Sequence, residues 1–248
     1  MIKVYGASVI GTSHIAADTP CHDSHYFQLL DNDLGVVAAI SDGMGSAKYA
    51  DVGSSLAANF VVDYLVENLE EKMEDEAIVE LIKEAYEKTH NRLQEEADIT
   101  EVDIKDLNAT LLVFLSIKDR QFYGQVGDCT AVGLKDETYK VIVEQQRGEY
   151  ANATFSICNL QSVKDGIYEK CDAFYEAVAL MSDGVESMSI SSKDNAVSQL
   201  FFAPFFKVFE HDTFNEKSIT KSLERFLSSE RINKKTDDDK TLLFIGFE

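Results

Sequence analysis

The chain has 248 residues, 45% of them hydrophobic, and both values fit one compact domain with a sizeable core. Its 44 acidic and 23 basic residues give a net charge of −21, which would repel nucleic acids and anionic membrane surfaces. Because no apolar segment approaches the length of a membrane span and no basic, apolar leader opens the sequence, we expect a cytoplasmic protein that binds neither nucleic acid nor membrane.

The first half of the chain predicts a buried strand followed by two helices. Residues 35–40 are continuously apolar, as in a strand that is covered on both faces. After an Asp-Gly turn, apolar side chains recur on one face of residues 46–69, which predicts an amphipathic helix. A second helix is predicted from Asp75, a candidate N-cap, to about Leu93. The two helices are expected to pack as an antiparallel pair.

From Ala109 the pattern changes to short strands. Polar turns separate four apolar segments at 109–116, 121–128, 130–134 and 139–143, which predicts an antiparallel meander, because parallel strands need longer connections. Another strand is predicted at 177–182, helices with a break at Pro204 at 194–227, and a last strand at 240–247. This order favours an α+β fold with helices on the outer faces of two packed sheets. Without a linker or repeat, the whole of 1–248 is expected to be one domain.

Four aspartates stand at the ends of predicted strands. Asp42 and Asp183 each precede a glycine after an apolar strand, Asp128 follows Val-Gly, and Asp238 lies in an acidic run before the last strand. A single Asp-Gly after a strand is typical of a simple turn. If these strand ends share one edge, however, the carboxylates converge and need cations to hold them together. Oxygen ligands favour Mg²⁺ or Mn²⁺, and Gly43, which has no Cβ, would let its carbonyl approach the same ion.

With these motifs in this order, the chain resembles the PPM-type, or protein phosphatase 2C, family of metal-dependent serine/threonine phosphatases. The matching blocks cover nearly the whole chain: "CHDS" with Asp23, "DGMGSAKYADVGSSLA" with Asp42, "VGDCT" with Asp128, "MSDGV" with Asp183 and "DDKT" with Asp238. The opening "GTSH…TPCHDS" is further similar to a bacterial branch of the family. The resemblance implies a four-layer α-β-β-α fold, an antiparallel β-sandwich flanked by helix pairs.

The resemblance also implies a binuclear Mn²⁺ or Mg²⁺ site at one end of the sandwich. Asp42 would bridge both ions, the Gly43 carbonyl would bind one, and Asp183 with Asp238 would bind the other. Of two neighbouring candidates, Asp238 is chosen over Asp239 because it stands three residues before a threonine, as the family's aspartate does.

Two further aspartates match other metal-binding positions of the family. Asp23 matches an acidic position that reaches a metal directly or through water. Asp128, together with Asp183, matches the ligands of a third ion in bacterial relatives. The metal ligands implied by the resemblance are thus Asp23, Asp42, Gly43, Asp128, Asp183 and Asp238.

The implied activity is hydrolysis of phosphomonoesters on phosphorylated proteins, by a water that two metal ions activate. Asp42, Asp183 and Asp238 would be the catalytic residues. The implied partners are a phosphoprotein substrate and a cognate Ser/Thr kinase, and the protein is expected to be a monomer.

Three departures from the family concern groups that would handle the phosphate. Asp18 stands where the family has its phosphate-binding arginine, five residues before the early aspartate. Cys129-Thr130 replaces the usual Ser-Arg; Cys129 would be redox-sensitive if it were exposed, and is otherwise a small buried residue. Met44 stands where eukaryotic members carry a histidine proposed as general acid.

The substrate clamp is therefore left open by the sequence. His14 and Lys48 are candidates for substrate binding because both lie near the motifs, as does Ser13; a satisfied core histidine and a solvated lysine are the alternatives. A pseudophosphatase that only binds phosphoproteins is the alternative function, since the arginine is missing.

Two other readings of the motifs fit less well. Haloacid-dehalogenase-like phosphatases need a second acidic residue two positions after the first, where this chain has Met44. His22 and His25 suggest a zinc site, but no third ligand follows at a compatible spacing.

Overall fold

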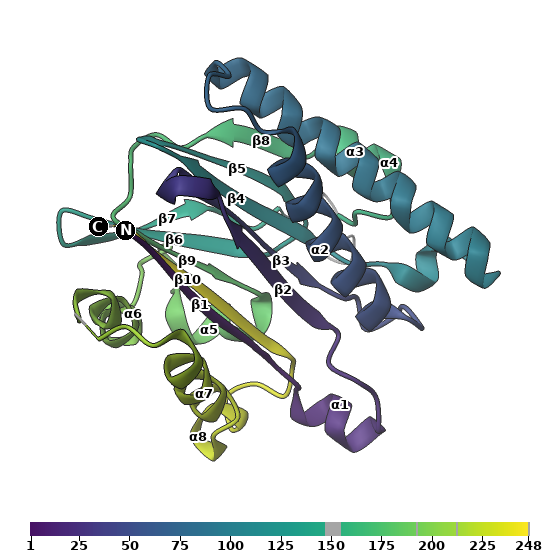
Figure 1. Cartoon of the computed structure of the whole chain (residues 1–248). Coiled ribbons are helices and arrows are strands. Elements are labelled where there is room, and N and C mark those ends of the chain that lie inside the picture. The colour runs from purple at the N-terminus through teal and green to yellow at the C-terminus, as the bar shows by residue number, and fades with distance from the viewer. Residues whose placement is uncertain (147–154, 192, 212, 248) are drawn as a thin grey trace.

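The computed structural model describes residues 1–146, 155–191, 193–211 and 213–247, and within them two five-stranded antiparallel sheets face each other (Figure 1). The first sheet has the order β1-β10-β9-β6-β7, with bounds β1 Ile2–Val9, β10 Lys240–Phe247, β9 Ala177–Met181, β6 Thr130–Lys135 and β7 Thr138–Val143. The second has the order β2-β3-β4-β5-β8, with bounds β2 Asp23–Leu29, β3 Gly35–Asp42, β4 Leu111–Ile117, β5 Arg120–Val126 and β8 Ile167–Lys170.

Helices cover the outer face of each sheet, as Figure 1 shows. The helix pair α2 (Ala50–Asn68) and α3 (Asp75–Thr100) packs on the β2–β8 sheet, and α6 (Gln199–Phe206) and α7 (Glu216–Leu227) pack on the other. The expected layers, with helices outside two packed sheets, are confirmed. The shorter elements are α1 Thr12–Ala17, α4 Leu160–Lys164, α5 Asp183–Ser189 and α8 Glu230–Asn233, with 3₁₀ turns η1 Asp31–Asp33, η2 Ile104–Leu107 and η3 Lys207–Glu210.

The unbroken apolar run of β3 is explained by burial on both faces. Val36 and Ile40 point into the core between the sheets, whereas Val37 and Ala39 face α2 and α3. Alternate side chains of a strand point to opposite faces, so a strand in an inner layer needs apolar residues at every position. The same alternation holds in β10, where Leu243 lies between the sheets.

Two sequence predictions about the strands and α3 need correction. The segments 121–128 and 130–134 do not form one meander: β5 and β6 belong to different sheets, and the link between them crosses from one layer to the other. Helix α3 begins after Glu74 rather than at an Asp75 cap, and it continues past Leu93 to Thr100. The polar extension stays helical because Ala97 is buried against the core.

The predicted break at Pro204 is also wrong, since this proline lies inside α6. A proline within a helix removes one N–H and leaves the carbonyl four residues earlier without its partner. That carbonyl belongs to Leu200, which is 92% exposed, so water can satisfy it. The helix ends two residues later, at Phe206.

Within the described ranges, no helix combines the length and the apolar character that a membrane span requires. The segment from Gln146 to Cys171, expected to form a flap near the site, contains α4 and β8 in its described part. Its residues 147–154 lie outside the described residues.

Candidate metal centre and active site

The strand ends bring the predicted aspartates to one edge of the sandwich. Asp23 and Asp42 are register partners at the ends of β2 and β3. Asp183 opens α5 directly after β9, and Asp238 lies two residues before β10, which pairs with β9. Asp128 lies in the link that crosses between the sheets. Both sheets therefore contribute carboxylates to the same place.

Four of these carboxylates share one pocket of about 390 Å³. Asp42, Asp128, Asp183 and Asp238 line it, and the other lining residues are His14, Gly43, Met44, Gly45, Ser46 and Thr110. Asp183 and Asp238 are exposed, whereas Asp42 and Asp128 are partly buried. None of the described residues that line it is a lysine or an arginine.

Asp23 lies behind this pocket rather than in its lining. Its side chain is 7% exposed, and Ser182 Oγ donates a hydrogen bond of 2.7 Å to its Oδ2. The register of β2 and β3 still places it opposite Asp42. It can therefore support a ligand from behind the pocket.

Close backbone contacts fix the residues that follow Asp42 and Asp183. A Cβ on Gly43 would lie 2.7 Å from both the Ala50 and His22 carbonyl oxygens, so only glycine fits there. A Cβ on Gly184 would lie 1.9 Å from the Asp239 carbonyl oxygen. This second contact holds the start of α5 against the start of β10, next to Asp238.

Burial and mutual repulsion raise the pKa values of these carboxyl groups. Burial raises the pKa of Asp42 well above its usual range, and the charges of Asp23, Asp183 and Asp128 raise it further. Burial also raises the pKa of Asp23 to about 7, against the lowering effect of the Ser182 hydrogen bond. The pKa of Asp128 is raised by burial as well.

Asp183 differs from Asp23 because much of its surface is exposed, although the surrounding protein still desolvates it enough to raise its pKa to about 6. Neighbouring Asp128 and Asp238 add to this rise. Because solvent screens charges at an exposed position, charge repulsion at Asp183 lowers the stability of the fold less than repulsion at buried Asp23.

The donor set fits a hard divalent cation. Among the described residues, no lysine or arginine forms an ion pair with any of these aspartates. Uncompensated carboxylates around a pocket, beside a glycine whose carbonyl has no side chain in its way, are the ligands that Mg²⁺ and Mn²⁺ prefer.

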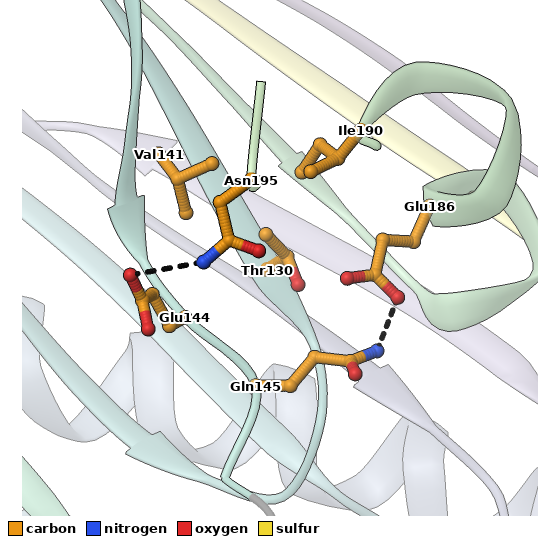
Figure 2. Close-up of a pocket in the computed structure, with 7 residues that line it drawn as sticks. All are labelled: Thr130, Val141, Glu144, Gln145, Glu186, Ile190 and Asn195. Atoms are coloured by element: carbon orange, nitrogen blue, oxygen red, sulfur yellow. Dashed lines mark hydrogen bonds between the residues drawn. The ribbon is translucent and has the colours of Figure 1, made fainter. Parts of the chain in front are cut away.

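A second, smaller pocket of about 210 Å³ was not foreseen from the sequence (Figure 2). Two of its lining residues stand close in sequence to aspartates of the first pocket: Thr130 comes two residues after Asp128, and Glu186 comes three residues after Asp183. Gln145 Nε2 donates to Glu186 Oε2 at 2.5 Å, and Asn195 Nδ2 donates to Glu144 Oε1 at 3.3 Å (Figure 2). Its acidic groups are thus engaged by amides.

Asp239 has a different role from its neighbour Asp238. It is 3% exposed, and the N–H groups of Gly11 and His22 donate to its Oδ1 and Oδ2, both at 2.5 Å. Burial would raise the pKa of Asp239, but these donors, together with His14, lower it below its usual range. The sequence treated Asp239 only as an alternative metal ligand, and its contacts with residues some 220 positions away carried no sequence signal.

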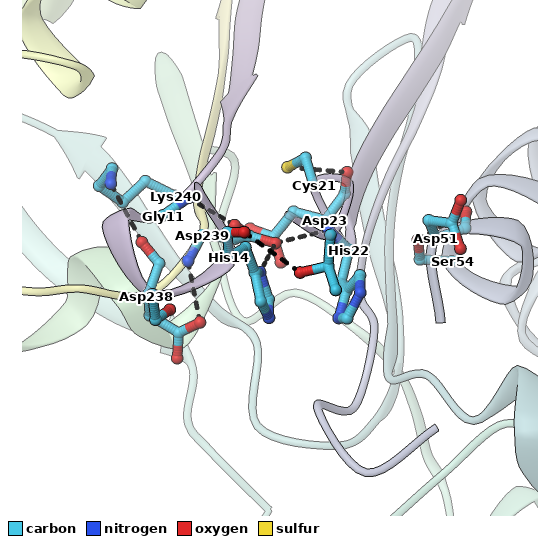
Figure 3. Close-up of polar contacts among 12 residues, drawn as sticks. Gly11, His14, Cys21, His22, Asp23, Asp51, Ser54, Asp238, Asp239 and Lys240 are labelled. Carbon is cyan, nitrogen blue, oxygen red and sulfur yellow. Dashed lines mark hydrogen bonds and ion pairs between the residues drawn. The ribbon is translucent and has the colours of Figure 1, made fainter. Parts of the chain in front are cut away.

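His14 lines the pocket and also contacts Asp239, which is not among the lining residues (Figure 3). Its Nδ1 is 2.9 Å from Asp239 Oδ2, which is ion-pair distance, although the ring N–H does not point along that line. The ring packs against the His22 ring, with 4.1 Å between the centroids. Of the two residues predicted to bind substrate, His14 is thus at the pocket.

Lys48 and Asp18 lie elsewhere. Lys48 is exposed, its Nζ lies 4.9 Å from the centroid of the Tyr49 ring, and it is not part of the pocket lining. Its role in substrate binding stays a prediction. Asp18, at the position of the family's arginine, is exposed and ends α1 in the left-handed conformation (φ 56°).

The other residues that the sequence singled out, His22, His25 and Cys129, make contacts within the fold. His25 shares a hydrogen bond of 2.8 Å with Ser8 Oγ, whereas His22 packs on His14, so the two do not form a zinc pair. Cys129 is 1% exposed, as expected for a small buried residue.

Lys240 is a further residue that the sequence did not single out. Its side chain is fully buried, and Nζ donates to the Asp238 carbonyl at 3.0 Å and to Asn233 Oδ1 at 3.2 Å. Burial lowers the pKa of Lys240, while the charges of Asp239 and Asp238 oppose this. The lysine thus fixes the backbone next to a pocket aspartate.

Comparisons with known proteins agree with this arrangement. The family model described as "Protein phosphatase 2C" matches residues 10–228. Serine/threonine-protein phosphatase 3 of Escherichia coli (strain K12) is 30% identical over 240 residues, which cover 95% of this chain and 94% of that protein.

Solved structures show the same fold. The serine/threonine phosphatase of S. agalactiae is similar with a TM-score of 0.70 and 14% identity, covering 100% of both chains. Stp1 of Staphylococcus aureus is similar with a TM-score of 0.65 and 15% identity, covering 100% of this chain and 96% of its own. Because the family model spans most of the sequence and the E. coli relative matches nearly all of it, the chain belongs to the protein phosphatase 2C family of serine/threonine phosphatases.

Proposed function

We propose that residues 1–248 form one catalytic domain that hydrolyses phosphoserine and phosphothreonine in proteins with the help of two Mn²⁺ or Mg²⁺ ions. The observation that carries this proposal is the pocket in which Asp42, Asp128, Asp183 and Asp238 converge without a cationic partner among the described residues. A cytoplasmic monomer that opposes a Ser/Thr kinase is part of the same proposal.

Each residue has a role in this scheme. Asp42 would bridge the two ions, the Gly43 carbonyl would bind one, and Asp183 and Asp238 would bind the other. When bound, such ions lower the pKa of a water and neutralise charge on the phosphoryl oxygens. Without them, the pocket carboxylates would repel a phosphate dianion.

Two aspartates support this set from its sides. Asp23, behind the pocket, would act directly or through a water, and Asp128 with Asp183 would hold a third, weaker ion. His14 and Lys48 are the proposed contacts to substrate phosphate; His14 is supported by its place in the pocket lining, while Lys48 rests on its place in the sequence.

The test is hydrolysis of p-nitrophenyl phosphate and of a phosphothreonine peptide by the purified chain with Mn²⁺, with Mg²⁺ and with EDTA. We expect activity only with metal, and a loss of at least about 100-fold in Asp42→Asn, since two-metal chemistry needs the bridging carboxylate. Asp119→Asn, at an exposed turn, is the matched control and should retain wild-type activity. A wild-type protein that is inert with every metal would leave only the binding role of a pseudophosphatase.

A further inference from the structure

The pocket lacks the histidine and the arginine that the family uses around the phosphate. One residue of its lining, His14, is paired with a buried carboxylate, that of Asp239. Met44 and Asp18 occupy the positions of a histidine and an arginine, and no described residue of the lining is a lysine or an arginine. His14 is the lining residue that can carry a proton on a ring nitrogen, and the buried carboxylate of Asp239 lies at its back (Figure 3).

The contacts of Asp239 determine how the His14 ring can be used. With Nδ1 at 2.9 Å from the carboxylate, Nε2 is the ring nitrogen left for a ligand in the pocket. Catalytic hydrogen bonds are often poorly aligned without substrate and tighten when it binds, so the off-line N–H is compatible with this use. The His22 ring, tilted by 45° with its centroid 4.1 Å away, also packs against the His14 ring.

A metal site is the competing interpretation of this cluster. Ligand atoms of His14, His22 and Asp239 lie within 4.8 Å of one another, and His22 Nδ1 is buried without a hydrogen-bond partner among the described residues. However, both oxygens of Asp239 already accept a backbone N–H at 2.5 Å, from Gly11 and His22. An ion on Oδ2 would have to share that oxygen with the His22 N–H, whereas a protonated ring nitrogen of His14 only adds one more donor to it.

We propose that His14, held by Asp239, is the proton donor to the serine or threonine oxygen that leaves phosphorus, an inference that rests on the proposed phosphatase function. In this step the attacking water oxygen bonds to phosphorus, and the bond from phosphorus to the side-chain oxygen breaks. The proton on His14 Nε2 passes to that leaving oxygen, which departs as a neutral hydroxyl. His14 then regains a proton from solvent, and the water proton that is lost goes to solvent, so atoms and charge balance.

Leaving-group chemistry separates a proton donor from a simple phosphate clamp. Nitrophenolate can leave phosphorus without a proton, whereas the serine oxygen needs one to leave. Loss of the proton donor should therefore slow hydrolysis of a phosphoserine peptide strongly and that of p-nitrophenyl phosphate only a little. We expect His14→Gln to lower kcat about 100-fold on a phosphoserine peptide but less than about 5-fold on p-nitrophenyl phosphate. Asp239→Asn, a positioning variant, should show the same pattern with a smaller loss of about 10-fold.

Two controls accompany this comparison. His211→Gln, at an exposed histidine, should leave both rates unchanged. Mn²⁺ binding measured by titration calorimetry should have wild-type stoichiometry in both test variants, and thermal denaturation shows that each is folded. If Asp239→Asn unfolds because its backbone contacts are lost, His14→Gln alone decides the question.

Other outcomes overturn the proposal in distinguishable ways. Equal losses on both substrates would make His14 a phosphate clamp. A bound Zn²⁺ or Mn²⁺ ion that is lost in His14→Gln would make the cluster a metal site. A wild-type protein without metal-dependent hydrolysis of either substrate would refute the phosphatase function itself, and the proton donor with it.

Discussion

Asp23 is a carboxylate that the fold buries behind the pocket, with Ser182 Oγ as a hydrogen-bond donor and Asp42 as its register partner. Removing it from water raises its pKa to about 7, from an ordinary value of 3.8. Between these two values the folded protein keeps a proton that the unfolded chain has released. Raising the pH through this window therefore disfavours the folded state.

The first prediction concerns the metal-free protein in EDTA. The stabilising effect of the protonated Asp23 is complete below about pH 4 and is lost as the pH rises through about 7. Asp23→Asn, which cannot ionise, should therefore stabilise the protein more at pH 8 than at pH 5.5. We expect the difference to be on the order of 1–3 kcal/mol, or roughly 2–10 °C in Tm. A variant whose effect on Tm is the same at both pH values would contradict this assignment.

For a single residue, the sequence predicts membership of the site when the residues next to it in the chain determine where it lies. Asp42, Asp128 and Asp183 each follow an apolar strand, so their meeting at one edge could be expected. The pairing of His14 with Asp239 could not, because it joins α1 to the start of β10 and leaves no local pattern.

At the scale of elements, the contact between α5 and the residues before β10 sets the distance between two pocket aspartates. Gly184 allows this contact, because a Cβ there would lie 1.9 Å from the Asp239 carbonyl oxygen. Alanine normally favours a helix over glycine by up to about 1 kcal/mol. In Gly184→Ala, by contrast, the backbone has to shift to make room for the Cβ. This shift would move Asp183 away from Asp238.

We therefore predict that Gly184→Ala lowers the free energy of unfolding by about 1–3 kcal/mol and weakens Mn²⁺ binding. Thermal denaturation and titration calorimetry measure the two effects. Gly45→Ala is the matched control for stability, since a Cβ at this position meets no atom within 4 Å. A Gly184→Ala protein as stable as Gly45→Ala would show that α5 can shift freely.

The elements themselves differ in how well the sequence predicts them. The strand β10 runs from Lys240 to Phe247 as predicted, because its apolar residues 242–245 pack alternately on the two faces of the sheet. The sequence predicts the link from β5 to β6 as part of a meander, because a short connection has the same pattern whether its two strands pair or belong to different sheets. The sequence predicts a helix break at Pro204 because it does not show that Leu200, whose carbonyl loses its partner, is exposed to water in the folded protein.

At the scale of the whole molecule, the candidate metal centre joins the two sheets. Asp42 comes from the end of β3 in one sheet, while Asp183 and Asp238 flank β9 and β10 in the other. In a protein with a net charge of −21, these uncompensated carboxylates push the strand ends apart. Bound cations would replace this repulsion with ligand bonds that cross the sandwich.

The last prediction follows from this position. An ion that binds only the folded state at 100 times its Kd adds about 2.7 kcal/mol of stability, which for a domain of this size raises Tm by roughly 5–10 °C. Mn²⁺ should produce such a rise in the wild type and in Asp119→Asn, and EDTA should reverse it. Asp42→Asn should lose most of the rise, because it removes the carboxylate shared between both proposed ions. An equal rise in Asp42→Asn would mean that the stabilising ion binds elsewhere, and the pocket would no longer be the centre that links the sheets.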